Sequence, residues 1–178
     1  MEEKALETLR AILARRGLPT TTTALGEKQY SIGDVVVIFV ESKNSPTKNT
    51  IDKLIEEFPK RTLILVSPVP LSESTKTYMR GYANEPVRMF HLQQLQFDIL
   101  THKKYGFPCR ILKNEEKTVL AQSLRIANLR QLPKVAYDDP YSLWLGAKPE
   151  DVIEYDIPSE AAGWAKKYRY VVKDVDEV

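Results

Sequence analysis

Two hydrophobic patterns alternate along this chain and predict its secondary structure. Apolar side chains at helical spacing predict helices at 2–16, 47–58 and 72–82. Unbroken β-branched and aromatic runs predict buried strands at 35–40, 62–66 and 87–90, with a further short strand expected at 28–32. Strands that alternate with helices at this spacing are typical of βαβ units with right-handed crossovers. Residues 1–101 are therefore expected to form an α/β domain around a mostly parallel sheet.

The pattern changes after HKKYGFPC, residues 102–109, which are expected to be a linker. A helix is predicted at 115–124, and beyond it short apolar segments alternate with Pro and Gly, as in QLPKV and DDPYSLWLG. Segments of this kind are typical of short strands joined by turns. Residues 110–178 are therefore predicted to form a small α+β domain with an antiparallel or mixed sheet.

Composition is typical of a soluble protein with a packed core. Of the 178 residues, 43% are hydrophobic and 28% are charged. The longest purely apolar run, Val35–Val40, is far shorter than the roughly 20 residues of a membrane span. The charged N-terminus lacks the apolar core of a secretory signal, and the single cysteine, Cys109, excludes an internal disulfide. These features predict an intracellular protein without a transmembrane helix.

Charge distinguishes the two parts of the chain only slightly. The formal net charge is +2, with 15 Lys/Arg against 12 Asp/Glu up to Phe107 and 11 against 12 beyond it. The first part is the better candidate to face phosphate groups, although a difference this small also fits a solvated surface.

The stretch DVVVIFVESK, residues 34–43, has the order of groups with which PD-(D/E)xK nucleases hold a divalent metal. Glu41 and Lys43 are two residues apart and face the same side of a strand, but Asp34 is seven residues from Glu41 and faces the other side. At about 3.3 Å per residue the two carboxylates lie roughly 23 Å apart, whereas metal–oxygen bonds measure about 2.0–2.6 Å. Asp34 and Glu41 are therefore not expected to share a metal.

A second carboxylate that could complete such a site is not well placed. A hairpin closing near Gly33 is expected to pair Glu27 with about Ile38, three residues short of Glu41. The chain also lacks the spacing of a zinc motif and a glycine-rich phosphate loop, so we expect no metal, no cofactor and no catalytic residue.

Two aromatic segments each allow two interpretations. Trp144 in YSLWLG fits a partner-binding anchor or the core of a small domain, and the core is favoured. KKYRYVV places basic and aromatic residues together, which also describes a half-buried strand with Tyr168 and Tyr170 on one face and Arg169 on the other.

Residues 115–172, EEKTVLAQSLRIANLRQLPKVAYDDPYSLWLGAKPEDVIEYDIPSEAAGWAKKYRYVV, carry a specific resemblance. This segment resembles the C-terminal assembly domain of the fifth common subunit of the eukaryotic nuclear RNA polymerases, a domain that also forms the corresponding small subunit of the archaeal enzyme. Many family landmarks occur in it in the same order. The residues that match them are carried over as assembly-domain candidates: Gln131, Leu132, Pro133, Asp139, Pro140, Gly146, Ser159, Glu160, Gly163, Tyr168 and Arg169.

The resemblance extends upstream to the N-terminal jaw domain of the eukaryotic subunit. TLRAILARRGL resembles its first helix, and residues 35–79 follow the jaw element by element. The family's jaw is similar to a restriction-endonuclease fold without the catalytic groups. The chain departs from the family where Glu150 or Asp151 replaces a usual Gly and where Trp164 replaces a basic residue. These departures indicate a divergent lineage, with a large DNA virus as one candidate source.

The resemblance implies a non-catalytic subunit of a multisubunit DNA-directed RNA polymerase. Its C-terminal domain would dock on the largest subunit, and its jaw would lie near downstream duplex DNA. Loops 43–48 and 67–74 would then approach the DNA through sequence-independent, salt-sensitive phosphate contacts. The candidates for these contacts are Lys43, Lys48, Ser72 and Lys76.

The location implied is the nucleus, or a cytoplasmic viral factory or virion for a viral protein, with no membrane partner. Two other functions stay open. One is a metal-dependent nuclease that uses Glu41 and Lys43, and the other is a stand-alone adaptor that binds another protein.

Overall fold

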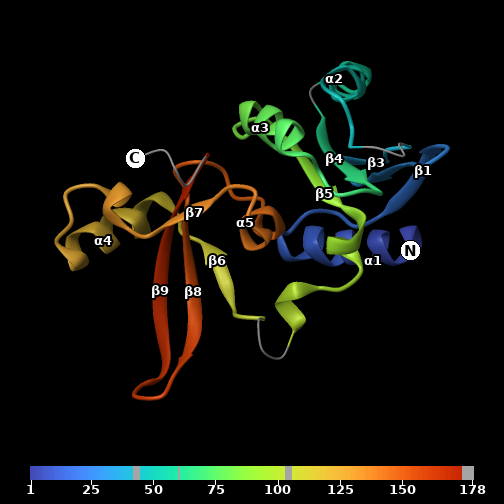
Figure 1. Cartoon of the computed structure of the whole chain (residues 1–178). Helices are drawn as coiled ribbons and strands as arrows, with labels where there is room; N and C mark the ends of the chain where they lie inside the picture. Colours follow the sequence, from blue (N-terminus) through green and yellow to red (C-terminus); the bar gives the residue numbers. More distant parts are fainter. Residues whose placement is uncertain (42–44, 60, 103–105, 174–178) are drawn as a thin grey trace. The chain divides into compact units, whose positions relative to one another are not determined.

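The computed structural model describes residues 1–41, 45–59, 61–102 and 106–173. The chain divides into two compact units, Met1–Asp98 and Ile99–Val178, each with its own sheet (Figure 1). The predicted linker at 102–109 falls in the first residues of the second unit. The described helices include none that is both long and apolar enough to cross a membrane.

The first unit is a mixed α/β structure. Its elements in chain order are α1 (Glu2–Arg15), β1 (Thr22–Gly26), β2 (Gln29–Ile32), β3 (Val35–Phe39), α2 (Lys48–Glu57), β4 (Thr62–Ser67), α3 (Glu73–Gly81), β5 (Val87–His91) and the 3-10 helix η1 (Leu92–Leu95). The predicted helices and buried strands are confirmed to within a residue or two at their ends. Strand β1 was not predicted, because its residues are mostly exposed and lack a hydrophobic pattern.

The sheet of the first unit has the order β1-β2-β3-β4-β5, and half of its pairings are antiparallel. β3, β4 and β5 run parallel, as expected from their helical crossovers. β1, β2 and β3 form an antiparallel meander instead, because two-residue turns join them and a parallel crossover needs a dozen residues or more. The prediction of a mostly parallel sheet is therefore wrong for its first three strands.

Helices cover both faces of this sheet. α2 and α3 lie on one side and α1 on the other (Figure 1). Alternation along β3 sends Val36 and Ile38 toward α2 and α3, where they join Ile51 and Met79 in one buried cluster. The strand is buried on both faces, which explains its unbroken apolar sequence.

The second unit has a smaller sheet with two long central strands. Its elements are the 3-10 helix η2 (Ile99–Thr101), β6 (Cys109–Ile111), α4 (Asn114–Leu124), the 3-10 helix η3 (Leu129–Gln131), β7 (Lys134–Ala136), α5 (Pro140–Leu145), β8 (Val152–Ser159) and β9 (Gly163–Val172). The strand order is β6-β8-β9-β7, with β7 and β9 parallel and the other pairs antiparallel. The prediction of a small α+β domain with an antiparallel or mixed sheet is confirmed.

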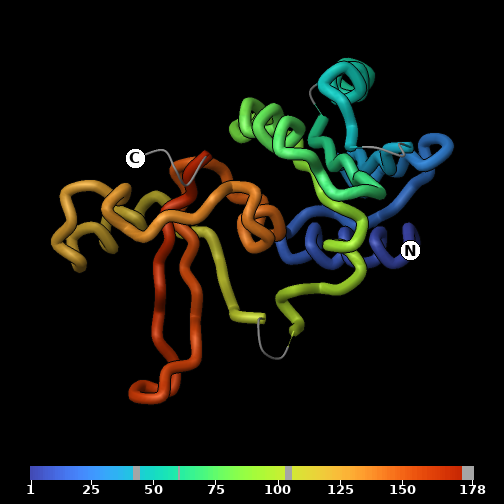
Figure 2. The backbone as a smooth tube through the Cα atoms, in the orientation of Figure 1, coloured from blue at the N-terminus to red at the C-terminus, as the bar shows by residue number. Residues whose placement is uncertain are grey.

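The β8–β9 hairpin projects beyond its neighbours as a two-stranded arm. β6 and β7 pair only with residues 153–155 and 170–172, so the hairpin continues without flanking strands to its turn. Figure 2 shows the two strands running side by side to that turn. Near its base one face packs against α4 through Leu120, Val152 and Tyr170, while Tyr155 on the other face contacts Tyr141 at the start of α5.

Candidate functional site

Glu41 is engaged by a lysine and not by a second carboxylate. Lys28 Nζ lies 2.6 Å from Glu41 Oε1, and this hydrogen bond raises the pKa of the lysine. Asp34 lies beyond the opposite end of β3. Among the described residues no group of three or more His, Cys, Asp and Glu side chains is arranged to hold a metal ion. Lys43 lies outside the described residues.

The predicted position of Glu27 is wrong. Gln29, and not Glu27, is opposite Ile38, because the hairpin pairs Ile32 with Val35 and leaves only two residues in its turn. Glu27 itself lies in the turn between β1 and β2. The register therefore brings Lys28 toward Glu41, and their ion pair joins the two chain segments at the end of the hairpin away from its turn.

Two loops of the first unit meet at the carboxyl edge of its parallel strands. Ser45 follows β3 and Ser72 follows β4, and Ser72 N donates a hydrogen bond to Ser45 Oγ at 3.0 Å. Buried Thr75 joins them, because its hydroxyl lies 2.9 Å from Ser45 Oγ and donates to Pro46 O at 2.9 Å. This is the edge at which parallel α/β sheets usually bind ligands.

Both helices that start at this edge have capped N-termini. Thr47 Oγ1 accepts from Thr50 N at the start of α2, and Ser72 Oγ accepts from Thr75 N at the start of α3. Ser72, a predicted DNA-proximal residue, therefore has a structural role as a cap. Helix N-termini carry partial positive charge, so two of them side by side favour an anion nearby.

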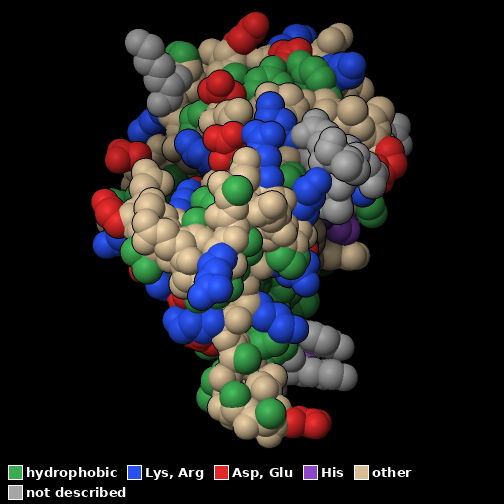
Figure 3. Space-filling model, turned by 90° about the vertical axis from the view of Figure 1, so that its left-hand side faces the viewer, with side chains coloured by type: hydrophobic (Ala, Val, Ile, Leu, Met, Phe, Trp, Pro, Cys, Tyr) green, Lys and Arg blue, Asp and Glu red, His purple; other side chains and the backbone are tan. Residues whose placement is uncertain are grey.

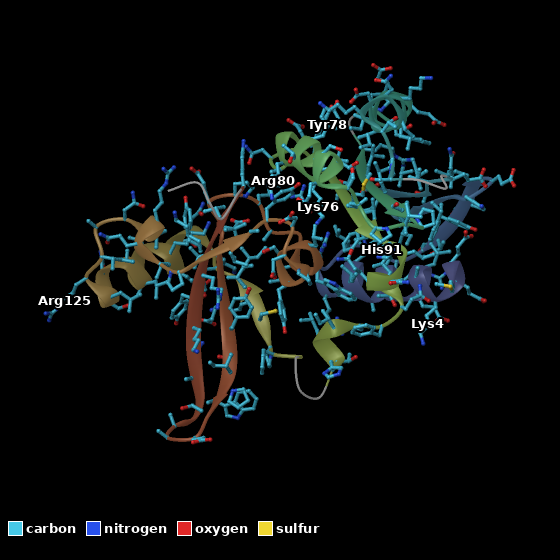
Figure 4. All side chains as sticks on the ribbon, in the orientation of Figure 1. Lys4, Lys76, Tyr78, Arg80, His91 and Arg125 are labelled. Atoms are coloured by element: carbon cyan, nitrogen blue, oxygen red, sulfur yellow. The ribbon has the colours of Figure 1, made fainter. Side chains whose placement is uncertain are left out.

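The predicted lysines Lys48 and Lys76 lie on the first turns of these helices. Lys48 Nζ lies 5.1 Å from the centre of the Tyr78 ring, which orients the ammonium group. Lys76 lies on the side of α3 away from Tyr78 (Figure 4) and forms an ion pair with Glu73 at 2.7 Å. The charge of Lys76 is thus offset locally, whereas Lys48 forms no ion pair with a described residue and is available to an anion.

A hydrogen-bond cluster that the sequence pattern did not indicate ties α2 to α3. Tyr78 Oη and Tyr82 Oη both donate to Asp52 Oδ1, at 2.5 and 3.0 Å. The bond to Asp52 raises the pKa of Tyr78, so its hydroxyl stays protonated. Spacing of four residues between the tyrosines places them on one helix face, but it does not indicate which residue of α2 they meet.

In the second unit, the predicted assembly residues Gln131, Leu132 and Pro133 immediately precede β7. Gln131 Oε1 accepts from Ala127 N, and Pro133 O accepts from Tyr170 N at 2.9 Å. Leu132 is buried in the α4 cluster with Leu120. These residues hold β7 against β9.

Other landmarks are caps and turns. Asp139 accepts from Tyr141 N and caps α5, Pro140 occupies its first turn, and Gly146 ends it with a φ of +72°. Ser159 is the last residue of β8 and pairs with Gly163, whose φ is +72°, and Glu160 lies in the turn between them. Trp144 is 4% exposed, which confirms its core position.

Tyr168 and Arg169 point to opposite faces of β9, as the alternation predicts. Tyr168 packs against the α4 cluster, whereas Arg169 lines a groove on the other face together with Asp139. The structure thus brings Asp139 and Arg169 together, while the remaining landmarks are distributed through the unit. A basic surface is visible where the hairpin leaves the unit (Figure 3).

Comparison with known proteins identifies relatives of the second unit above all. The family model for the C-terminal domain of RNA polymerase Rpb5 matches residues 97–171. Over 79 residues the chain is 44% identical to the DNA-directed RNA polymerase subunit Rpo5 of Thermococcus onnurineus, covering 44% of this chain and 94% of that protein. Over 74 residues it is 44% identical to the Rpo5 subunit of Aeropyrum pernix, covering 42% and 80%.

A longer similarity includes the first unit. Over 153 residues the chain is 24% identical to the DNA-directed RNA polymerase RPB5 homolog of African swine fever virus, which covers 85% of this chain and 62% of that protein. This alignment spans residues of both units, whereas the archaeal proteins match less than half of the chain.

Proposed function

This chain belongs to the Rpb5 family of DNA-directed RNA polymerase subunits, and from that premise we propose that it docks on the largest subunit of its polymerase through the unit Ile99–Val178. Subunits of this family are non-catalytic components of the enzyme. The observation that supports the proposal best is that the family match, residues 97–171, coincides with this compact unit.

Affinity purification of the tagged full chain from its own source tests the docking. We expect the largest polymerase subunit to co-purify, and the tag alone serves as the control. Recovery of other proteins without any large polymerase subunit would support the stand-alone adaptor instead.

For the first unit we propose the role of a jaw near downstream DNA, with a restriction-endonuclease-like fold that lacks catalytic groups. The carboxyl edge supports this role, because two helix N-termini and Lys48 lie there. Ser72 and Lys76 would shape this edge, and Lys43 would extend it. Such contacts are made to the phosphates of the DNA backbone and do not depend on its sequence.

The ion pair between Lys28 and Glu41 speaks against the nuclease alternative. Incubation of the purified chain with plasmid and Mg²⁺ or Mn²⁺ is the direct check, and cleavage that disappears on Glu41→Ala would contradict the jaw. We infer a nuclear location for a cellular protein, and a cytoplasmic viral factory or virion for a viral one.

A further inference from the structure

A groove of about 620 Å³ lies on one face of the β8–β9 hairpin, within the second unit. Its lining from the hairpin includes Tyr155, Ile157, Lys167 and Arg169, and Phe107 and Tyr141 complete its apolar part. The four hairpin residues lie on the face opposite Tyr168 and the α4 cluster, and Phe107 and Tyr141 lie beside that face.

The groove is open because α5 covers this face of the hairpin only as far as Tyr141. Tyr141 and Tyr155 pack edge to face with ring centres 5.5 Å apart, which closes the groove where α5 begins. α5 has only six residues, and Ile157 lies farther along β8 toward the hairpin turn. Among the described residues of this unit, no helix or strand therefore covers the hairpin face between Tyr155 and the turn.

The side of the groove formed by β9 is basic. Lys167 and Arg169 stand side by side on β9 facing it, two residues apart. On the other face, the neighbouring Lys166 is already paired with Glu154 at 2.9 Å. Lys167 forms no ion pair within the part of the chain that the structure describes. Its ammonium group is therefore available to a partner's carboxylate.

The lining favours a peptide over a nucleic acid. Asp139 also lines the groove, and its carboxylate would repel the successive phosphates of a nucleic-acid backbone. A peptide meets less of this repulsion, because it can bring a single carboxylate to Lys167 and Arg169 and uncharged groups to the rest of the groove. The rings and aliphatic side chains of Phe107, Tyr155 and Ile157 provide an apolar surface that a peptide side chain can cover.

We propose that this groove receives an extended segment of the largest polymerase subunit, with an acidic residue beside Lys167 and Arg169 and a bulky apolar side chain against Ile157 and Phe107. This inference rests on the docking proposed above and names the surface that performs it.

Substitutions of neighbouring lysines on the two faces of β9 test the groove. Binding of the purified largest subunit to the full chain is measured for the wild type, Lys167→Glu and Lys166→Gln. We expect Lys167→Glu to weaken binding about tenfold or more, because it replaces attraction of a carboxylate by repulsion. Lys166→Gln, on the opposite face, should change it less than about twofold. Thermal melting of each full chain verifies that it is folded.

A photo-crosslinking residue at position 167 then identifies the occupant in the assembled polymerase. We expect a crosslink to an acidic segment of the largest subunit, and none from position 166. Equal binding by the wild type and a folded Lys167→Glu variant would overturn the groove proposal while the docking function stands. A crosslink from position 167 to nucleic acid would overturn the proposed occupant. Failure of the wild type to bind any polymerase subunit would instead overturn the docking function itself.

Discussion

Glu154 is a buried carboxylate held by cations from two other strands. Arg110 and Lys166 lie 3.0 and 2.9 Å from the same oxygen, and Arg110 also pairs with Glu116 at 2.8 Å. Although desolvation by burial raises it, the pKa of Glu154 lies below its ordinary value of 4.5 because Lys166 and Arg110 donate hydrogen bonds to the carboxylate. A group whose pKa is lowered by folding stabilises the folded state above its unfolded pKa, and this contribution disappears as the pH falls.

We expect Glu154→Gln to lower the free energy of unfolding by about 1–2 kcal/mol at neutral pH, a modest value because both cations are half exposed. The difference from the wild type should shrink as the pH falls below about 4.5. Urea unfolding at pH 7 and at pH 4 measures it, with Glu160→Gln in the exposed hairpin turn as the control. A difference that is the same at both pH values would contradict this account of the pair.

Gly33 is needed for two reasons that can be separated experimentally. Its φ is +59°, and a Cβ atom there would lie 2.9 Å from Pro19 O. Gly17 has a φ of +72° but open space around it, so it shares the strain without the clash. We expect Gly33→Ala to lower the free energy of unfolding by about 2–3 kcal/mol and Gly17→Ala by about 1 kcal/mol. Equal losses on chemical denaturation would show that the close approach to Pro19 carries no cost.

At the scale of elements, Thr75 connects the loops after β3 and β4 to helix α3. Thr75→Val keeps the shape and removes the hydroxyl that contacts Ser45, Pro46 and Ser72. We expect a loss of about 2 kcal/mol in the free energy of unfolding, because Pro46 O is then left without this donor. Thr77→Val on the exposed face of the same helix is the control and should have little effect. If both variants melt alike, the hydroxyl cluster does not stabilise this edge.

Helix ends and buried strands were predictable because hydrophobic period and capping residues are local signals. Thr47 and Ser72 mark the starts of α2 and α3, and Gly17 follows the end of α1. The hairpin near Gly33 was also expected, but its register, which brings Lys28 to Glu41, was not, because the register depends on the length of the turn. The groove was also beyond prediction, since it combines Tyr141 of α5 with strand residues that pair across a hairpin.

At the scale of the whole molecule, the first unit is proposed to lie near DNA and the second unit to bind the largest subunit. We expect Lys48→Ala to weaken the association of the assembled polymerase with DNA slightly and to reduce the slope of log affinity against log salt by about 1, as for one lost phosphate contact. Recovery of the largest subunit should not change. Lys53→Ala, farther along the same helix, is the matched control, and an equal effect of both variants on DNA association would contradict a specific role for the carboxyl edge.

In contrast to Lys48→Ala, Val135→Asp should impair recovery of the largest subunit. Val135 is buried in β7, and an unpaired charge there costs several kcal/mol. We expect the second unit to lose its fold and the variant to lose the largest subunit in affinity purification. Unchanged recovery would argue against assembly through residues 110–178.

The projecting hairpin also bears on how the free subunit survives before assembly. Beyond β7, the outer edge of β9 leaves backbone donors and acceptors unpaired in the described chain, and such an edge can recruit a strand from another copy and start aggregation. Lys166, Lys167 and Arg169 lie along this edge, and stacking it against the same edge of a second molecule would bring like charges together. The positive charge that suits the hairpin to an acidic partner thus also keeps unassembled copies from polymerising with one another.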